Sequence, residues 1–500
     1  MTKIIFYGIL IAVFGFFLRI KPRLGKEKKG VDTWYFLSCV REYKKTHKIP
    51  TVLKNYLLEI DEQWYPPGFI IFLSILPQKV LEKYHWLINP IIDTIQLVIV
   101  YIFSFLCFSD IKIAIISSLI YATAPTLISE CSTLTSRLFG NLNFTLFLLS
   151  IFYFISTSNI FWFLLVLGLG FLLLMTHKMA TQNLFFIMLG MSLIFLDWRY
   201  LAILAGIFLF TLIFSKGFYL KILKAHKEIL LFWKKNLNNL GVHQIYDSKI
   251  YKKENIENRR LFPVFHQKGL KGIIRHLVYI FGYNPWILLI AFVPFSVSLW
   301  RFDFFNFLFW WVILTYLFVF LTTFFLPMRF LGEGYKYIKM GIFPLAILIA
   351  VLLFSNLIPI YLFIALLLLN LFLIFRFVGK ATVNVQNEDL LLIFDFLKNE
   401  KKDGIMLLPT HLADAIAYLT NKKVLWGTHG SDGTGRWAKI EEFFPVIQKP
   451  IEYFFEKYDL HFLLIDKNYV EPEDLKLNNR FAHLITKANY SLFEYLTPKI

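Results

Sequence analysis

Long apolar runs, separated by short polar breaks, cover most of the chain and predict membrane-spanning helices. The first run occupies residues 4–18, and similar runs recur until about residue 377. A helix that crosses a bilayer needs about 20 mostly apolar residues. We count about eleven such runs, so the sequence predicts an α-helical polytopic membrane protein. The expected spans cover residues 4–18, 87–108, 111–129, 138–155, 160–174, 184–196, 200–214, 286–300, 304–326 and two further runs that end near residue 377.

The pattern changes after residue 380, where short apolar runs alternate with amphipathic segments. Strands are expected at 405–408, 424–426, 462–465 and 491–495, and helices at 389–398, 411–419 and 440–458. Alternating strands and helices indicate a small sheet with crossover helices. We therefore divide the chain into a transmembrane domain, residues 1–379, and a small α/β domain, residues 380–500.

The longer polar segments all fall on one face of the membrane when the spans are counted from an N-terminus inside the cell. They are residues 19–86, 130–137, 177–178, 215–283, 329–336 and the domain after 380. Residues 19–86 form the first external loop, with an amphipathic helix expected at 33–48 and an interfacial apolar stretch at 69–75. The external segment 215–283 is basic, and its apolar residues are spaced as in helices that lie on a membrane surface. This face, with the α/β domain on it, is expected to be extracytoplasmic.

The composition agrees with a membrane protein and points to anionic partners. Hydrophobic residues make up 57% of the chain and charged residues only 17%, whereas soluble domains carry about 25% charged residues. The net charge of +18 favours lipid headgroups or a phosphorylated substrate. Because the basic residues are spread over the loops between spans, we expect no nucleic-acid partner. The same distribution conflicts with the rule that Lys and Arg mark cytoplasmic loops, so the inverted topology remains an alternative.

Two of the external loops carry recognisable motifs. The first loop opens with a Gly-Val-Asp-Thr-Trp-Tyr motif that contains Asp32, and it closes with a Tyr-Pro-Pro-Gly turn that begins at Tyr65. Pro125 precedes the second loop, which leads into Ser-Arg-Leu-Phe-Gly at 136–140. These motifs resemble those of GT-C-type glycosyltransferases, the class that includes the oligosaccharyltransferase catalytic subunit and the protein mannosyltransferases. The resemblance implies a membrane-embedded GT-C-like fold and sugar transfer from a polyprenyl-phosphate carrier.

The resemblance makes Asp32 the candidate catalytic base, because such enzymes place an acid early in the first external loop. A carboxylate there can take the proton of the acceptor. The oligosaccharyltransferase relatives also place acids after the second-loop arginine, but Asn141 and Asn143 stand at those positions here. The sequence therefore leaves open whether a divalent metal, Mg²⁺ or Mn²⁺, takes part, and it assigns no metal ligand. The alternative role of Asp32 is to cap a helix that begins at Thr33.

Cations are needed around a lipid phosphate that leaves, because its negative charge grows in the transition state. Arg329 and Lys336 flank a Gly-Glu-Gly motif, where glycine lets a phosphate approach the backbone closely. Glu333 of that motif is a candidate to orient one of these cations, and Asp61 or Glu62 to hold the sugar or assist the base. The full set of substrate-binding candidates is Asp61, Glu62, Tyr65, Arg137, His177, Lys178, Arg329, Glu333 and Lys336. The alternative for each cation is a side chain that snorkels at a helix end.

The sequence thus predicts a glycosyltransferase in the cell (inner) membrane of a bacterium or archaeon, with its active site on the extracytoplasmic face. The expected partners are membrane lipid, a polyprenyl-phosphate sugar donor and an acceptor that is a glycan, a lipid or a protein. One alternative is a ligase or polymerase of lipid-linked glycans, which would rely on Arg and His rather than on Asp32. Another is a transporter or flippase. A transporter needs charged groups within its spans, and apart from Asp93 the predicted spans are nearly free of them.

Overall fold

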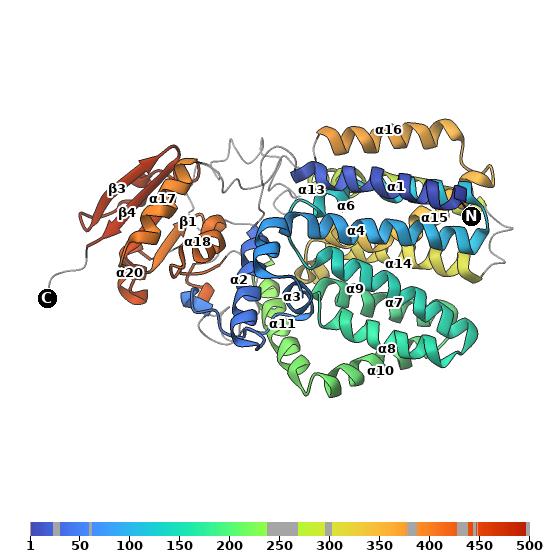
Figure 1. The fold of residues 1–500 in the computed structure, drawn as a ribbon, viewed down its shortest axis with the longest axis horizontal. Coiled ribbons are helices and arrows are strands. Elements are labelled where there is room, and N and C mark those ends of the chain that lie inside the picture. Colours follow the sequence, from blue (N-terminus) through green and yellow to red (C-terminus); the bar gives the residue numbers. More distant parts are fainter. Residues whose placement is uncertain are drawn as a thin grey trace.

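The protein is an elongated molecule with a helix bundle at one end and a small sheet domain at the other (Figure 1). The computed structural model describes residues 2–23, 31–59, 63–237, 269–295, 303–376, 378, 388–427, 439–443, 447 and 449–496. The helices before the sheet domain are α1 Thr2–Ile20, α2 Val31–Thr46, α3 Gly68–Ser74, α4 Gln78–Phe108, α5 Ile111–Ala122, α6 Pro125–Glu130, α7 Arg137–Thr157, α8 Ile160–Leu174, α9 Lys178–Phe195, α10 Arg199–Phe214, α11 Phe218–Lys235, α13 Gly269–Tyr283, α14 Asp303–Phe324, α15 Ile342–Phe354 and α16 Ile360–Arg376. Short 3₁₀ helices are η1 Lys21–Arg23, η2 Leu57–Glu59, η4 Pro285–Phe295, η6 Leu326–Leu331 and η7 Gly334–Gly341.

The apolar helices make this an integral, multi-pass membrane protein. Within the described residues, six helical segments are long and apolar enough to cross a bilayer, and the number rises to eight if each bent pair is one span. Three further apolar helices, α5, α8 and α16, are shorter. The predicted number of about eleven spans is therefore not confirmed, although the class of protein is. The stretch predicted to cross at 286–300 begins as the 3₁₀ helix η4, which is bent by 90° from α13.

Part of the basic segment forms a helix that turns away from the bundle, as its residue pattern predicts. Helix α11 bends by 114° from α10, and the turn uses Gly217 at a φ of +78°, a conformation that suits glycine. Along α11, Ile222, Ala225 and Phe232 are buried, whereas Lys224 and its neighbouring lysines face outward. Helices α2, α3 and α11 thus lie between the bundle and the sheet domain (Figure 1). Residues 238–268 of the basic segment lie outside the described residues.

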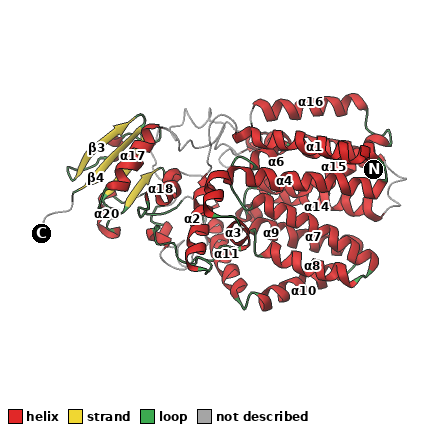
Figure 2. Cartoon of the chain, in the orientation of Figure 1, coloured by secondary structure: helices red, strands yellow, loops and turns green. Residues whose placement is uncertain are grey.

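The C-terminal domain is the predicted small α/β unit (Figure 2). Its sheet has the strand order β1-β2-β4-β3, with β1 parallel to β2 and the other pairs antiparallel. The described strands and helices are α17 Glu388–Asn399, β1 Ile405–Leu408, η8 Thr410–Leu412, α18 Ala413–Thr420, α20 Ile451–Tyr458, β2 Phe462–Asp466, η9 Pro472–Leu475, β3 Phe481–Lys487 and β4 Tyr490–Tyr495. Strand β3 was not predicted. The helix predicted at 440–458 is shorter than expected, because Pro450 precedes its first residue, Ile451.

The first external loop is joined to this C-terminal domain. The backbone N–H groups of Leu57 and Leu58 donate to the carbonyls of Val424 and Leu425, both at 2.9 Å. The stretch predicted as the strand 424–426 therefore forms isolated bridges, to Tyr56 of the loop and to β1, rather than a strand of the sheet. Helix α18 also packs against α2. The C-terminal domain thus lies on the same side of the bundle as α2, as the alternation of spans predicts.

A buried ion pair ties α1 to α4 inside the bundle. Arg19 Nε donates to Asp93 Oδ2 at 2.6 Å, and both side chains are completely buried. The hydroxyl of Tyr121 donates to Asp93 Oδ1 at 2.7 Å, and Arg19 Nη1 donates to the Gly15 carbonyl at 3.0 Å. Asp93 is therefore the partner of a cation in a neighbouring helix. Its bonds join α1, α4 and α5 into one unit.

Removing only the acid of this pair is expected to destabilise the protein more than removing both charges. Asp93→Leu leaves a buried guanidinium without its carboxylate, a defect that costs about 3–5 kcal/mol. Arg19→Met combined with Asp93→Leu removes the uncompensated charge, so part of the stability should return. Thermal unfolding of the purified protein in detergent measures both. A double variant that is no more stable than Asp93→Leu would contradict this account.

Candidate functional site

Asp32 lies in the first turn of α2, at the surface of the bundle that faces the C-terminal domain. The helix begins at Val31 rather than at the predicted Thr33, so Asp32 is not the residue that caps a helix starting there. An acid in the first turn still interacts favourably with the helix dipole. Residues 33–40 are all buried, so this part of α2 is packed within the protein and is not the half-exposed amphipathic helix that was predicted.

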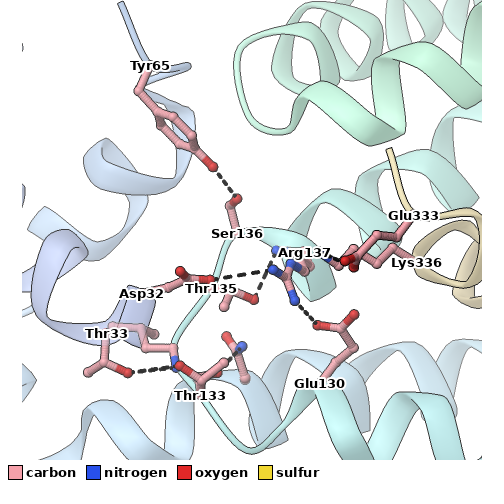
Figure 3. Close-up of polar contacts among 12 residues, drawn as sticks. Asp32, Thr33, Tyr65, Glu130, Thr133, Thr135, Ser136, Arg137, Glu333 and Lys336 are labelled. Carbon is pink, nitrogen blue, oxygen red and sulfur yellow. Dashed lines mark hydrogen bonds and ion pairs between the residues drawn. The ribbon is translucent and has the colours of Figure 1, made fainter. Parts of the chain in front are cut away.

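A threonine next to Asp32 fixes α2 against the second external loop. The backbone N–H of Leu134 donates to Thr33 Oγ1 at 3.1 Å, and the hydroxyls of Thr33 and Thr133 are also 3.1 Å apart. Figure 3 shows Thr33 and Thr133 beside Asp32. The loop that leads into Arg137 is therefore held directly against the start of α2.

Arg137 joins Asp32 to a second acid, Glu130. Its Nη2 lies 3.6 Å from Asp32 Oδ2, and its Nη1 lies 3.2 Å from Glu130 Oε2 (Figure 3). The other oxygen of Glu130 accepts from Lys339 Nζ at 2.7 Å. The side chain of Lys339 is completely buried and that of Glu130 is 11% exposed. A planar guanidinium suits this shared geometry, because its N–H groups point toward two carboxylates at once.

The charge network acts strongly on Glu130. Burial alone would raise the pKa of this carboxyl, but the ammonium of Lys339 and the guanidinium of Arg137 outweigh it and lower the pKa to about 2. Glu130 is therefore ionised throughout the physiological range. Neither Glu130 nor Lys339 was a sequence candidate. The sequence offered only a weak signal for them: Glu130 stands at the end of an apolar run, and Lys339 stands at the start of another.

A cavity of about 270 Å³ opens beside this network. It is lined by Asp32, Phe36, Tyr65, Thr135, Ser136, Arg137, His177, Lys178, Met179, Gln182, His226, Ile229, Leu230, Trp233, Phe330, Leu331, Gly332 and Lys336. The lining includes the predicted base and five of the predicted substrate-binding residues, from four separate polar segments of the chain. Their convergence agrees with the prediction that these segments share one face.

His177 and Lys178 reach the cavity from the start of α9. His177 caps this helix, and its Nδ1 accepts from the backbone N–H of Ala180 at 3.3 Å. Burial, followed by the charges of Lys339 and Arg137, lowers the pKa of His177 well below its usual value, so the imidazole is neutral. Lys178 Nζ lies 5.4 Å from the centre of the Tyr65 ring, a cation–π distance.

The polar break at 329–336 contributes one cation, Lys336, to the cavity, and Glu333 of the same segment forms an ion pair with it. Glu333 Oε2 lies 2.6 Å from Lys336 Nζ and accepts from the Tyr335 hydroxyl at 2.6 Å. Glu333 is thus paired with the cation Lys336, and its role in orienting that cation for a substrate stays a prediction. Arg329 is outside the cavity lining, and its Nε donates to the Thr323 carbonyl at 2.8 Å. Asp61 and Glu62, the remaining candidates, lie outside the described residues.

The two glycines of the Gly-Glu-Gly motif serve the chain itself. Gly332 has a φ of +129°, which other residues rarely adopt. A Cβ on Gly334 would lie 2.1 Å from Thr323 Oγ1 and 2.5 Å from the Val319 carbonyl, so this glycine allows close packing against α14. Only Gly332 lines the cavity. From the sequence, a phosphate is expected to approach the backbone at these glycines. Of the two, only Gly332 is placed where a ligand in the cavity could reach it.

The described residues do not fit a divalent metal. Among them, no group of three or more His, Cys, Asp and Glu side chains has an arrangement that could hold one. The oxygens of Glu130 are bound to Lys339 and Arg137, and Asp32 also faces Arg137. Asn141 donates to Gln96 Oε1 at 3.1 Å within the bundle. The described carboxylates nearest the cavity thus face cations of the protein itself.

Solved structures resemble the whole chain, although no family model and no curated protein matches it. The archaeal oligosaccharyltransferase AglB from Archaeoglobus fulgidus, in complex with an inhibitory peptide and a dolichol-phosphate, aligns with a TM-score of 0.53 and 12% identity, over 93% of this chain and 69% of that chain. The Archaeoglobus fulgidus oligosaccharyltransferase in complex with Zn and sulfate aligns with a TM-score of 0.55 and 12% identity, over 98% and 73%. ArnT from Cupriavidus metallidurans aligns with a TM-score of 0.48 and 10% identity, over 99% and 98%.

At these identities the oligosaccharyltransferase comparison establishes the fold and nothing more. The predicted resemblance to GT-C-type enzymes is therefore confirmed at the level of the fold.

The depressed pKa of Glu130 predicts how stability depends on pH. An unfolded chain protonates this carboxyl near pH 4.5, whereas the folded protein keeps it ionised until about pH 2. Its stabilising contribution, on the order of 3 kcal/mol, should therefore be complete above pH 4.5 and be lost as the pH falls toward 2. Glu130→Gln should lower the unfolding temperature at pH 7, and the difference from the wild type should shrink below pH 4.5. Glu473→Gln, at an exposed position, is the control. A difference that stays constant down to pH 3 would contradict the assignment.

Proposed function

We propose that this protein is a membrane glycosyltransferase that moves a sugar from a polyprenyl-phosphate carrier to an acceptor on the extracytoplasmic face. The observation that carries the proposal is one cavity at the end of an apolar helix bundle, lined by the carboxylate of Asp32 and by the cations Arg137, Lys178 and Lys336. Sugar transfer from a lipid phosphate needs such a base and such cations together. The related fold of the archaeal oligosaccharyltransferase, solved with a dolichol-phosphate, supports a lipid-phosphate donor.

Asp32 acts as the general base in this proposal. Its carboxylate accepts the proton of the acceptor nucleophile, the new bond forms at the anomeric carbon of the sugar, and the bond from that carbon to the phosphate oxygen breaks. The electron pair of that bond leaves with polyprenyl phosphate. Arg137 holds Asp32 in place through the 3.6 Å contact, while its other side is tied to Glu130.

Lys178 and Lys336 bind the phosphate. Lys336 is held by Glu333 and Lys178 lies against Tyr65, so both ammonium groups are positioned before the donor arrives. The phosphodiester carries one negative charge and the leaving phosphate carries up to two, so fixed cations stabilise the leaving group more than the donor. His177, at the start of α9, also lines the cavity but is neutral, so it adds no positive charge to the proposed phosphate site.

The apolar part of the cavity suits the lipid carrier. Ile229 and Leu230 of α11 line it together with Phe330 and Leu331 of η6. Because α11 turns away from the membrane helix before it, its apolar face lies at the end of the bundle. A polyprenyl chain can therefore remain in the bilayer while its phosphate reaches the cations.

The observed polar groups disfavour the transporter alternative. The one acid noted in the predicted spans, Asp93, is paired with Arg19 and fully buried, and it does not line the cavity. A glycan ligase or polymerase would use the same donor class but would not need Asp32. Substitution of that residue separates the two enzymatic alternatives. The extracytoplasmic placement, in the cell membrane of a bacterium or archaeon, is part of the proposal, and the basic loops keep the inverted topology as its alternative.

Asp32→Asn is expected to lower turnover by at least about a hundredfold, because an amide cannot take the acceptor proton. Donor binding should persist, since the change removes a negative charge near the phosphate. The two measurements are the transfer rate at saturating donor and donor binding by the purified variant. Wild-type turnover with full binding would favour the ligase alternative, in which Asp32 has only a structural role.

Lys336→Met is expected to raise the Michaelis constant for the lipid donor and to lower turnover as well, because the cation contacts a charge that grows during the reaction. Lys336→Arg should retain part of the donor affinity and part of the turnover, because it keeps the positive charge. Lys227→Ala, at an exposed position on α11, is the charge-matched control. Kinetics of Lys336→Met that equal those of this control would remove Lys336 from the proposed phosphate site.

A further inference from the structure

The cavity has a second polar region, which the proposed chemistry does not use. Gln182 lies one helical turn after Lys178 on α9, and His226 lies on α11; both line the cavity and both are partly exposed. Gln182 Nε2 is 3.1 Å from His226 Nε2. The hydrogen bond between them joins two helices across one side of the cavity.

Tyr337 fixes the orientation of this pair. Its hydroxyl donates to Gln182 Oε1 at 2.5 Å and lies 2.9 Å from the Leu331 carbonyl, and its side chain is completely buried. Because the amide oxygen faces Tyr337, the amide nitrogen faces His226 and donates to the imidazole. Among the described residues, the Gln182 side chain bonds only Tyr337 and His226. One amide N–H therefore remains for a ligand.

An oriented amide beside a neutral imidazole is suited to recognise hydroxyl groups, which both donate and accept hydrogen bonds. The position agrees with a sugar that is attached to the bound phosphate. Side chains one turn apart on a helix lie about 5–6 Å from each other at Cβ, which is the scale of the step from a phosphate to the ring that it carries. Lys178 and Gln182 are four residues apart on α9, so a phosphate at Lys178 would place its sugar near Gln182.

The charges around the cavity disfavour a sugar that carries a positive charge. Among the lining residues, all of them described, Asp32 is acidic, whereas Arg137, Lys178 and Lys336 are basic. Acids outside the lining pair with two of these cations. A sugar with a free amino group would add a cation about one helical turn from Lys178, and like charges disfavour such a ligand.

We infer that Gln182 and His226 form the subsite for the sugar of the donor, and that this sugar carries no positive charge. The inference rests on the proposed function, because it takes the phosphate of the same donor to lie at Lys178 and Lys336. It assigns a role to one residue of α9 and one of α11 that neither the motifs nor the resemblance to GT-C enzymes singled out.

Binding of matched carriers to the purified protein tests this subsite. The probes are polyprenyl phosphate without a sugar, and the same carrier bearing glucose, mannose, galactose or 2-amino-2-deoxyglucose. Each competes against radiolabelled bare polyprenyl phosphate. The wild type should bind at least one of the three neutral sugar carriers at least about tenfold more tightly than the bare carrier, and the amino-sugar carrier more weakly than that neutral one.

Gln182→Leu and His226→Phe keep the size of each side chain and remove its hydrogen bonds. Each variant should lose about tenfold in affinity for the preferred neutral carrier while its affinity for the bare carrier stays within twofold. Lys227→Ala should leave both affinities unchanged. Retained binding of the bare carrier also shows that each variant is folded.

Different failures have different meanings. Equal losses for bare and glycosylated carriers, unchanged affinities in both variants, or a wild type that prefers no sugar would each overturn the subsite alone. A preference for the amino-sugar carrier would overturn the assignment of a sugar without a positive charge. A wild type that binds neither bare nor glycosylated carrier would overturn the proposed function, and the subsite with it.

Discussion

Arg137 shares one guanidinium between two carboxylates that arrive from different parts of the chain, Asp32 at the start of α2 and Glu130 at the end of α6. Charges so near an apolar bundle are costly unless each is paired. Lys339, completely buried, completes the set from η7. The two most buried groups, Lys339 and Glu130, are the ones that depend most on these partners for their charged forms. The site and the packing of its supporting segments therefore depend on the same ionic network.

The C-terminal domain extends this dependence beyond the bundle. The ring of Tyr418 on α18 lies 4.3 Å from the guanidinium of Arg41 and packs against Trp34 of α2, and its hydroxyl donates to Glu82 of α4 at 2.6 Å. In addition, Tyr56 in the loop after α2 forms a bridge with Val424 of the C-terminal domain. Helix α2 is thus held on one side by the second external loop and on the other by the C-terminal domain. The direction in which Asp32 points is set from both sides.

Much of this arrangement could be predicted from the sequence, because alternation of apolar spans is a strong signal. It placed Asp32, Arg137, Lys178 and Lys336 on one face, and the structure brings them to one cavity. Hydropathy alone does not establish which apolar helices cross the bilayer, so the exact number of spans was not predictable from it.

Pairing between distant residues was also beyond prediction. Lys339 and Glu130 are 209 positions apart, and nothing in either local sequence identifies the other as its partner. A charge at the boundary of an apolar run was the only indication, and it fits a snorkelling side chain equally well. The α2 helix shows the same limit, because its residue pattern predicted an amphipathic helix at 33–48, whereas residues 33–40 are all buried. Contacts with α18 and the second external loop, both distant in sequence, bury it instead.

In the proposed function the site both holds an acid for catalysis and binds an anion, and the division of charge within it is compatible with both. Asp32 would repel a phosphate if its charge were uncompensated, and Arg137 faces this acid at 3.6 Å. The second acid, Glu130, is compensated by the rest of Arg137 and by Lys339. Lys178 and Lys336 line the cavity, and in the proposal they face the phosphate of the donor. As the sugar departs in the proposed reaction, the charge on that phosphate grows, and ammonium groups that are already in place gain interaction energy without any movement of the protein. In the proposal, proton acceptance is thus assigned to Asp32 and leaving-group stabilisation to these two lysines.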